Sequence, residues 1–266
     1  MQNPAMPMLR TIAATRYVTP LREGGSLPAL VEGDDEGLYV LKFRGAGQGP
    51  KALVAELIAG EMARAVGLNV PEIVLMELDP ELARTEPDRE IQDLIRASAG
   101  INFALDYLPG AVTYDPLLQA LDPAVASAIV WHDALVSNVD RTPRNSNLLL
   151  WHGRIWLIDH GAALIFHHQW SDDPQAQARK PFPSIKDHVL LPWATAVDAA
   201  DAALAPKLTP QLLDSVIAEV PDAWLDGDPV FATPQAQRAA YRIYLAERLA
   251  FRASLLQEVR RAADQL

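Results

Sequence analysis

The chain has 266 residues, of which 23 are Lys or Arg and 34 are Asp or Glu, so its formal net charge is −11. This acidity disfavours a nucleic-acid-binding protein and a protein that binds an anionic membrane surface, because both need clustered basic residues. The sequence contains no cysteine, which excludes disulfide bonds, thiolate ligands and a cysteine nucleophile. Half of the residues are apolar, as in a globular protein with one large domain or two modest lobes.

The N-terminal residues 1–18 contain prolines and two arginines. A secretory signal peptide needs an unbroken apolar stretch in that region. No segment of the sequence approaches the ~20 consecutive apolar residues of a membrane-spanning helix. We therefore expect a cytoplasmic protein.

Up to residue 108, the sequence alternates short β-like runs with turn residues and includes one clear helix. In residues 51–66, apolar side chains recur at helical spacing, and Gly67 follows as a helix-ending glycine. A polar helix that ends at Ala97 is expected to be a solvated insertion. The expected strands are 27–32, 38–43, 69–78 and 101–108.

From Pro109 onward the sequence is mainly helical. The expected elements are an apolar core helix at 123–136, a hairpin of strands 148–151 and 154–159, and helices at 194–203, 210–220 and 234–263. This order predicts an α+β fold with two lobes. Residues 1–108 form an N-terminal antiparallel sheet with one helix, and residues 109–266 form a mainly helical C-terminal lobe.

Four polar residues surround the expected hairpin. Asp140 follows the apolar helix, Asn145 and Asn147 come five and seven residues later, and Asp159 ends the hairpin. Phosphoryl transfer uses residues of this kind, because one carboxylate orients the attacking hydroxyl group while an Asn and a second Asp hold Mg²⁺ against the nucleotide phosphates. The hairpin fixes the distance between the Asn and the second Asp, so the pattern is geometric as well as compositional.

This pattern resembles the atypical branch of the protein-kinase superfamily. Asp140 and Asn145 form an Asp-x4-Asn motif, and the hairpin leads to an Asp-x-Gly motif at Asp159. Glu56 followed by the segment 63–71, Ala-Arg-Ala-Val-Gly-Leu-Asn-Val-Pro, is similar to a helix and turn of HipA-like kinases. Phosphoinositide kinases are more distant relatives. The resemblance implies a two-lobed protein-kinase-like fold.

The resemblance assigns nucleotide-binding roles to the N-terminal lobe. Lys42 on the strand 38–43 would contact the ATP phosphates, and Glu56 on the following helix would pair with this lysine. Asp106, Tyr107 and Leu108 would form the hinge whose backbone groups bind adenine. Taken alone, Lys42 could also be an edge-strand lysine that keeps the sheet soluble.

In the C-terminal lobe, the resemblance makes Asp140 the catalytic carboxylate and Asp159 a Mg²⁺ ligand. The remaining metal ligand is either Asn145, which keeps the five-residue step from Asp140, or Asn147, which directly precedes the hairpin. We lean slightly to Asn145 and keep both. The sequence departs from typical kinases at His160, which stands where the metal-binding triplet has Phe.

Residues 22–28 are expected to form a phosphate-covering loop between the first two strands, and this loop contains Gly24, Gly25 and Ser26. The glycines allow close approach of the backbone to phosphate oxygens, and Ser26 adds a hydroxyl donor. HipA-like kinases are switched off by phosphorylation of a serine in this loop, so the resemblance makes Ser26 a candidate regulatory acceptor. An ordinary flexible hairpin is the other interpretation of these residues.

The histidines favour structural roles over a metal site. The pair His167 and His168, and also His188, have no carboxylate at ligand spacing, so we expect surface or loop histidines. His132 with Asp133 is expected to be a satisfied pair in the core.

The resulting hypothesis is an ATP- and Mg²⁺-dependent phosphotransferase that modifies a Ser or Thr hydroxyl of an unknown protein. Two alternatives remain open. One is a pseudokinase that senses nucleotide or binds a protein. The other is an enzyme of the same fold that phosphorylates a lipid or small molecule or transfers AMP.

Overall fold

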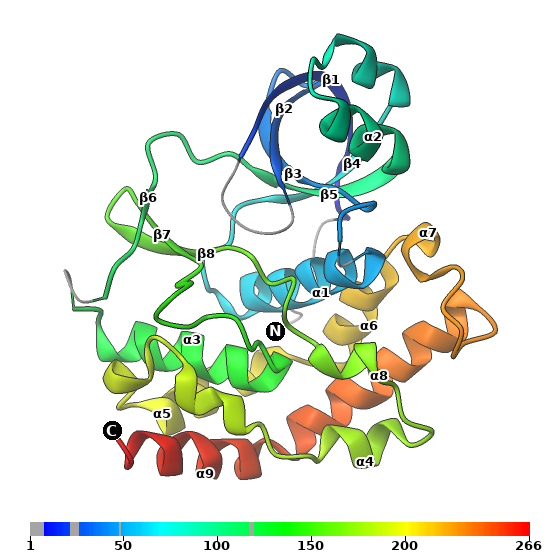
Figure 1. Cartoon of the computed structure of the whole chain (residues 1–266). Coiled ribbons are helices and arrows are strands. Elements are labelled where there is room, and N and C mark those ends of the chain that lie inside the picture. The colour runs from blue at the N-terminus through cyan, green and yellow to red at the C-terminus, as the bar shows by residue number, and fades with distance from the viewer. Residues whose placement is uncertain (1–7, 22–26, 48, 117–119) are drawn as a thin grey trace.

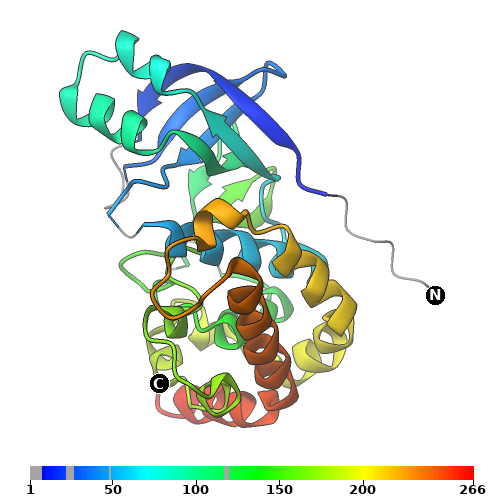
Figure 2. The same ribbon diagram turned by 90° about the vertical axis from the view of Figure 1, so that its right-hand side faces the viewer.

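A five-stranded barrel and a larger helical part make up the computed structural model, which describes residues 8–21, 27–47, 49–116 and 120–266. Figures 1 and 2 show the barrel at one end of the molecule and most helices at the other, with helix α1 (Pro50–Val66) at the junction. The structure therefore has the mixed α+β architecture that the sequence predicts.

The barrel closes in a way that the sequence did not indicate. Its strand order is β1-β2-β3-β5-β4, and β1 and β4 close it as a parallel pair, whereas the other neighbouring strands are antiparallel. Strand β1, for which the sequence analysis gave no bounds, supplies this parallel pair. The strands are β1 (Thr11–Pro20), β2 (Ala29–Gly33), β3 (Leu38–Lys42), β4 (Ile73–Leu78) and β5 (Gly100–Asp106).

Strand alternation explains how Lys42 comes to face away from the barrel interior. Successive side chains of a strand point to opposite faces. Tyr39 and Leu41 of β3 belong to the buried cluster inside the barrel, so Val40 and Lys42 lie on the outer face. The Lys42 side chain then reaches helix α1, where it contacts Glu56.

The segment between β4 and β5 covers part of the barrel core, which corrects the expectation of a solvated insertion. It contains the 3-10 helix η1 (Pro80–Thr85) and helix α2 (Arg89–Ala97). Ala83, Ile91 and Ile95 belong to the buried cluster of the barrel. Ile91 and Ile95 are four residues apart and share one helix face, while charged residues occupy much of the opposite face. The predominance of charged residues concealed this apolar face.

Helix α1 is buried along most of its length and shares a core with the helical part. The buried cluster that contains Leu57, Ile58 and Met62 also contains residues of α3 (Pro123–Val136), α6 (Pro210–Ala218) and α8 (Pro234–Ala250). At the start of α1, Lys51 pairs with Asp228 at 3.0 Å. The helix ends at Gly67, whose φ of 99° suits glycine.

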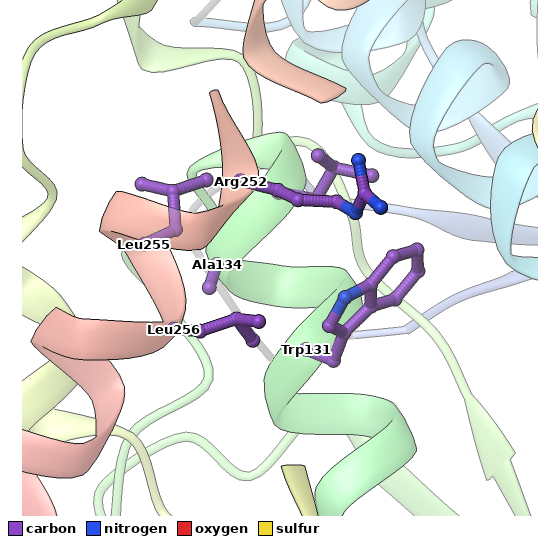
Figure 3. Close-up of a pocket in the computed structure, with 6 residues that line it drawn as sticks. Trp131, Ala134, Arg252, Leu255 and Leu256 are labelled. Atoms are coloured by element: carbon purple, nitrogen blue, oxygen red, sulfur yellow. The ribbon is translucent and has the colours of Figure 1, made fainter. Parts of the chain in front are cut away.

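The helical part is organised around α3 (Pro123–Val136). Figure 3 shows α9 lying against it, with Leu255 and Leu256 facing Ala134 and Trp131 around a small apolar depression. The other helices are α4 (Pro174–Ala178), α5 (Val197–Leu204), α6 (Pro210–Ala218), α7 (Asp222–Leu225), α8 (Pro234–Ala250) and α9 (Arg252–Ala263), with 3-10 helices η2 (Ile165–His168), η3 (Pro183–Asp187), η4 (Leu191–Trp193) and η5 (Ala205–Lys207). The helix expected at 234–263 is interrupted at Phe251.

The predicted hairpin forms and belongs to a small three-stranded sheet. Strands β7 (Leu148–Trp151) and β8 (Arg154–Leu157) pair, and β6 (Val112–Thr113) adds to β7. His152 and Gly153 form the turn with φ of 48° and 72°, the positive values that a tight two-residue hairpin requires. Within the described ranges, no helix combines the length and the apolar character needed to cross a membrane.

The buried face of α2 gives the first testable prediction. Ile95→Ala should lower the free energy of unfolding by about 2–5 kcal/mol, because it removes buried methyl groups and leaves a cavity. The exposed Asp93→Ala on the same helix should change it by no more than about 0.5 kcal/mol. Urea unfolding measures both, and equal small effects would restore the interpretation of a solvated insertion.

Candidate active site

A buried ammonium group shared by two carboxylates lies where the barrel meets the helical part. Lys42 Nζ donates to Glu56 Oε1 and, at 2.7 Å, to Asp159 Oδ1. The side chains of Lys42 and Glu56 are 11% and 1% exposed, whereas that of Asp159 is 42% exposed. Asp159 is therefore the member of the cluster that a ligand can reach from solvent.

The charges of this cluster shift the pKa values of its members. Burial alone would lower the pKa of Lys42, but Glu56 and Asp159 outweigh it and raise that pKa. Burial would raise the pKa of Asp159, but Lys42 outweighs it and lowers the value to about 2. Burial, aided by the charge of Asp159, raises the pKa of Glu56 to about 7 against the opposing effect of Lys42. Lys42 and Asp159 thus remain charged at neutral pH.

Glu56 also fixes the start of the segment that follows β8. The backbone N–H of His160 donates to Glu56 Oε2 at 2.9 Å. A Cβ atom on Gly161 would lie 3.0 Å from Glu56 Oε1, tighter than ordinary van der Waals contact. The glycine of the Asp-x-Gly motif therefore leaves room for the glutamate that pairs with Lys42.

Asp140, Asn145 and Asn147 lie close together in the structure. Asn145 Nδ2 donates to Asp140 Oδ2 at 2.7 Å, and Asn145 is exposed. Asn147 is buried, and its Nδ2 lies 3.4 Å from Asp140 Oδ2 and 3.5 Å from the carbonyl oxygen of Asp159. Of the two asparagines, Asn147 therefore lies between the two aspartates.

The backbone is unusual at two of these positions. Asn147 has a φ of 50° and Asp159 a φ of 55°, in the left-handed region that non-glycine residues seldom occupy. Ile158 N donates to the carbonyl of Asn147 at 3.1 Å, which ties the two segments together. Such conformations persist where the surrounding structure holds them, and they cluster at functional sites.

The predicted hinge residues connect β5 to the helical part. The amides of Asp106 and Tyr107 donate to the carbonyls of Glu72 and Leu38, at 2.8 and 2.9 Å. Within the described ranges the amide of Leu108 donates to no protein group. The amides of Asp106 and Tyr107 are thus occupied, whereas that of Leu108 has no protein acceptor among the described residues. Gly24, Gly25 and Ser26 lie outside the described residues.

The surroundings of His132, His167 and His188 differ from those expected. His188 is buried and hydrogen bonds through Nε2 to Asp133 Oδ2 at 2.9 Å, and His167 is buried with its Nδ1 2.9 Å from the hydroxyl of Tyr241. Asp133 pairs with His188 and Arg141 instead of with His132. His168 is exposed, as expected. The partners of His188 and His167 lie 55 and 74 residues away in the sequence, so local sequence patterns could not reveal these contacts.

The oxygen donors of this site suit Mg²⁺. No three or more His, Asp and Glu side chains gather into a metal-binding group within the described ranges. A kinase site needs fewer protein ligands, because phosphate oxygens and water complete the coordination shell. The carboxylate of Asp159 is accessible, and the side-chain amide nitrogen of Asn147 lies 3.5 Å from the main-chain carbonyl oxygen of Asp159. Carboxylate and amide oxygens are the hard ligands that Mg²⁺ prefers.

Comparison with known proteins agrees with this geometry. The model of the HipA-like kinase family matches residues 15–247. The structure is similar to that of the proinflammatory kinase CtkA of Helicobacter pylori, with a TM-score of 0.57 and 15% identity over 96% of this chain and 98% of that chain. A Golgi casein kinase aligns with a TM-score of 0.48 and 11% identity over 96% and 72% of the two chains.

No curated protein sequence matches the chain significantly. At 15% identity, the similarity to CtkA shows the fold alone. The predicted two-lobed, kinase-like α+β fold is therefore confirmed.

The contact at Gly161 gives a prediction about the ion cluster. Gly161→Ala should lower the free energy of unfolding by about 1–3 kcal/mol, because the added methyl group presses on the carboxylate of Glu56. Gly47→Ala is the matched control, since a Cβ atom there would meet nothing within 4 Å. Thermal or urea unfolding measures both variants, and a Gly161→Ala protein as stable as the control would contradict the tight packing.

Proposed function

The chain belongs to the HipA-like kinase family, and from this premise we propose that it transfers the γ-phosphoryl group of ATP, with Mg²⁺, to a Ser or Thr hydroxyl of a protein. The observation that carries the proposal is the convergence of Lys42, Glu56 and Asp159 beside Asp140. These residues come from distant parts of the chain, and together they supply the groups that phosphoryl transfer needs.

Lys42 is suited to bind a phosphate oxygen. Its ammonium group stays charged between Glu56 and Asp159, and Glu56 is too deeply buried to meet the nucleotide itself. The role of Glu56 is therefore to hold the lysine in place. Asp159 and the nearby Asp140 place two carboxyl groups beside the proposed phosphate site, so a divalent cation at Asp159 would offset the repulsion of an incoming triphosphate.

We assign the second metal ligand to Asn147. It lies between Asp140 and Asp159, whereas Asn145 is exposed and contacts Asp140 alone among the proposed catalytic and metal-binding residues. Mg²⁺ bound by Asp159 and Asn147 would neutralise charge on the phosphates and orient them. Asn145 would hold the carboxylate of Asp140 through its 2.7 Å hydrogen bond.

Asp140 is proposed to accept the proton of the attacking hydroxyl group. Its side chain is partly exposed, so an acceptor can approach it. It lies outside the lysine cluster and leaves nucleotide binding to the other groups. At the hinge, the amide of Leu108 is proposed to donate to adenine, against the partly buried outer-face side chains of Leu30 and Val40.

The presence of the complete set of proposed phosphate-binding, metal-binding and catalytic residues favours an enzyme over a pseudokinase, because a nucleotide sensor would not need Asp140. A lipid or small-molecule acceptor, or transfer of AMP, would use the same residues. Comparison of α-labelled with γ-labelled ATP separates transfer of AMP from transfer of the γ-phosphoryl group. The glycine loop with Ser26, the division into lobes at residue 108 and the cytoplasmic location stay predictions.

Labelled ATP tests the proposal. With Mg²⁺ and a mixture of protein acceptors, label should pass to Ser or Thr from γ-labelled ATP and not from α-labelled ATP. Asp140→Asn should reduce transfer by about 10²-fold or more while keeping the rise in melting temperature that Mg²⁺ and ATP produce. Transfer of α-label, or of none by the parent, would contradict the proposed reaction.

Lys42→Met tests nucleotide binding. It should lose the ATP-dependent rise in melting temperature, since that rise scales with ln(1 + [L]/Kd). The rise is measured from the melting temperature of each nucleotide-free variant, because removal of Lys42 leaves the buried Glu56 without its partner. An undiminished rise would remove Lys42 from the nucleotide site.

Substitutions of Asn147 and Asn145 should have different effects on activity. Asn147→Ala should raise the Mg²⁺ concentration for half-maximal activity about 10–100-fold, as loss of a metal-site contact typically does. Asn145→Ala should lower the transfer rate at saturating Mg²⁺ and leave this Mg²⁺ requirement unchanged. Initial rates over a Mg²⁺ series measure both, and the reverse pattern would assign the ligand to Asn145.

A further inference from the structure

Three buried side chains form a cluster behind the loop that carries Asp140. Asp133 belongs to α3, Arg141 directly follows Asp140, and His188 follows the 3-10 helix η3. Their side chains are 0%, 0% and 2% exposed. Arg141 Nε and His188 Nε2 both donate to Asp133 Oδ2, at 2.6 and 2.9 Å. None of these residues belongs to the proposed nucleotide site.

The hydrogen bonds determine the charge of the cluster. The amide of Leu190 donates to His188 Nδ1 at 3.0 Å, so His188 Nε2 carries the hydrogen that it donates to Asp133, and the imidazole is neutral. Burial would raise the pKa of the Asp133 carboxyl group, but Arg141 and His188 outweigh it and hold the pKa well below its usual range. Asp133 and Arg141 are thus a buried ion pair with balanced charge.

Arg141 extends from this ion pair to the end of the loop. Its Nη1 donates to the carbonyl of Asn147 and, at 3.4 Å, to that of Ser146. Asn147 is the residue whose φ of 50° lies in the left-handed region. The guanidinium group therefore connects helix α3 to the backbone of a residue with an unfavourable conformation.

Asp133 also supports the other end of the same loop. Asn138 Nδ2 donates to Asp133 Oδ1 at 3.0 Å, and Asn138 Oδ1 accepts from the amide of Asp140 at 3.2 Å. One carboxylate thus fixes Asp140 through Asn138 and fixes Asn147 through Arg141. The distance between the proposed catalytic carboxylate and the proposed metal ligand depends on this anchor.

We propose that Arg141 is a positioning residue that, anchored by Asp133, holds Asn147 in its left-handed conformation so that its amide stays between Asp140 and Asp159. The inference rests on the proposed function, in which Asn147 binds the metal. The planar guanidinium group can bond Asp133 and the loop carbonyls at once, whereas a lysine offers one compact ammonium group. Arg141→Lys therefore keeps a charge for Asp133 and loses the simultaneous contacts.

Arg248 supplies a matched control. Like Arg141, it is almost fully buried, and it donates to main-chain carbonyls. Its acceptors lie outside the loop 140–147 and are the carbonyls of Ala134, Leu135, Ala178 and Lys180 and the hydroxyl of Ser137. Arg248→Lys is therefore an equivalent substitution of a buried arginine whose hydrogen bonds do not involve the loop 140–147.

Titration calorimetry with ADP, in the absence and in the presence of Mn²⁺, tests the inference on the full chain. In Arg141→Lys, the tightening of ADP binding by Mn²⁺ should fall by about tenfold or more, as for loss of support of a metal ligand. Binding of ADP without metal should be unchanged. Arg248→Lys should keep the tightening seen in the parent.

Other results would overturn either the positioning role of Arg141 or the proposed function. Full retention of the Mn²⁺ effect in Arg141→Lys, or an equal loss in Arg248→Lys, would overturn the positioning role. If Arg141→Lys does not fold, Asp133→Asn decides, because it keeps Arg141 and weakens its anchor. A Mn²⁺ effect equal to that of the parent in this variant would also overturn the inference. A parent that binds no ADP with or without Mn²⁺ would instead reject the proposed function.

Discussion

The site depends on one ammonium group held between two carboxylates. Lys42 comes from a barrel strand, Glu56 from helix α1 and Asp159 from the segment after β8, so this contact joins three separate parts of the chain. A buried ion pair adds little to stability compared with apolar packing, but loss of one partner is costly. The arrangement is therefore better explained by the proposed nucleotide site, in which Lys42 would bind a phosphate oxygen and the accessible Asp159 would bind the metal ion.

The position of Glu56 is set by the helical part of the molecule. Helix α1 shares a buried core with α3, α6 and α8, and Lys51 joins its start to Asp228. Lys42, in contrast, belongs to strand β3 of the barrel. The ion pair between Lys42 and Glu56 thus spans the junction that Figure 1 shows below the barrel. Its geometry therefore depends on the position of the barrel relative to the helices. Any change in that placement would alter the contact between Lys42 and Asp159.

Local patterns predicted the elements that carry the site, and long-range contacts account for what they missed. Alternation along 38–43 identified the strand of Lys42, and the hairpin before Asp159 forms as expected. Strand β1 closes the barrel by a parallel pair that no local signal specifies. Ile91 and Ile95 did carry a helical apolar signal, which the surrounding charges obscured. The bonds of Arg141 with Asp133 and the buried state of His188 arise only when distant segments pack together.

The most direct test of the central claim is a crystal structure of the chain with Mg²⁺ and a non-hydrolysable ATP analogue. We expect phosphate oxygens against Lys42 Nζ, and Mg²⁺ bound by the carboxylate of Asp159 and the amide oxygen of Asn147. We also expect Glu56 to keep its contact with Lys42 and not to touch the ligand. A nucleotide bound away from Lys42, or a metal held without Asp159, would contradict the proposed site.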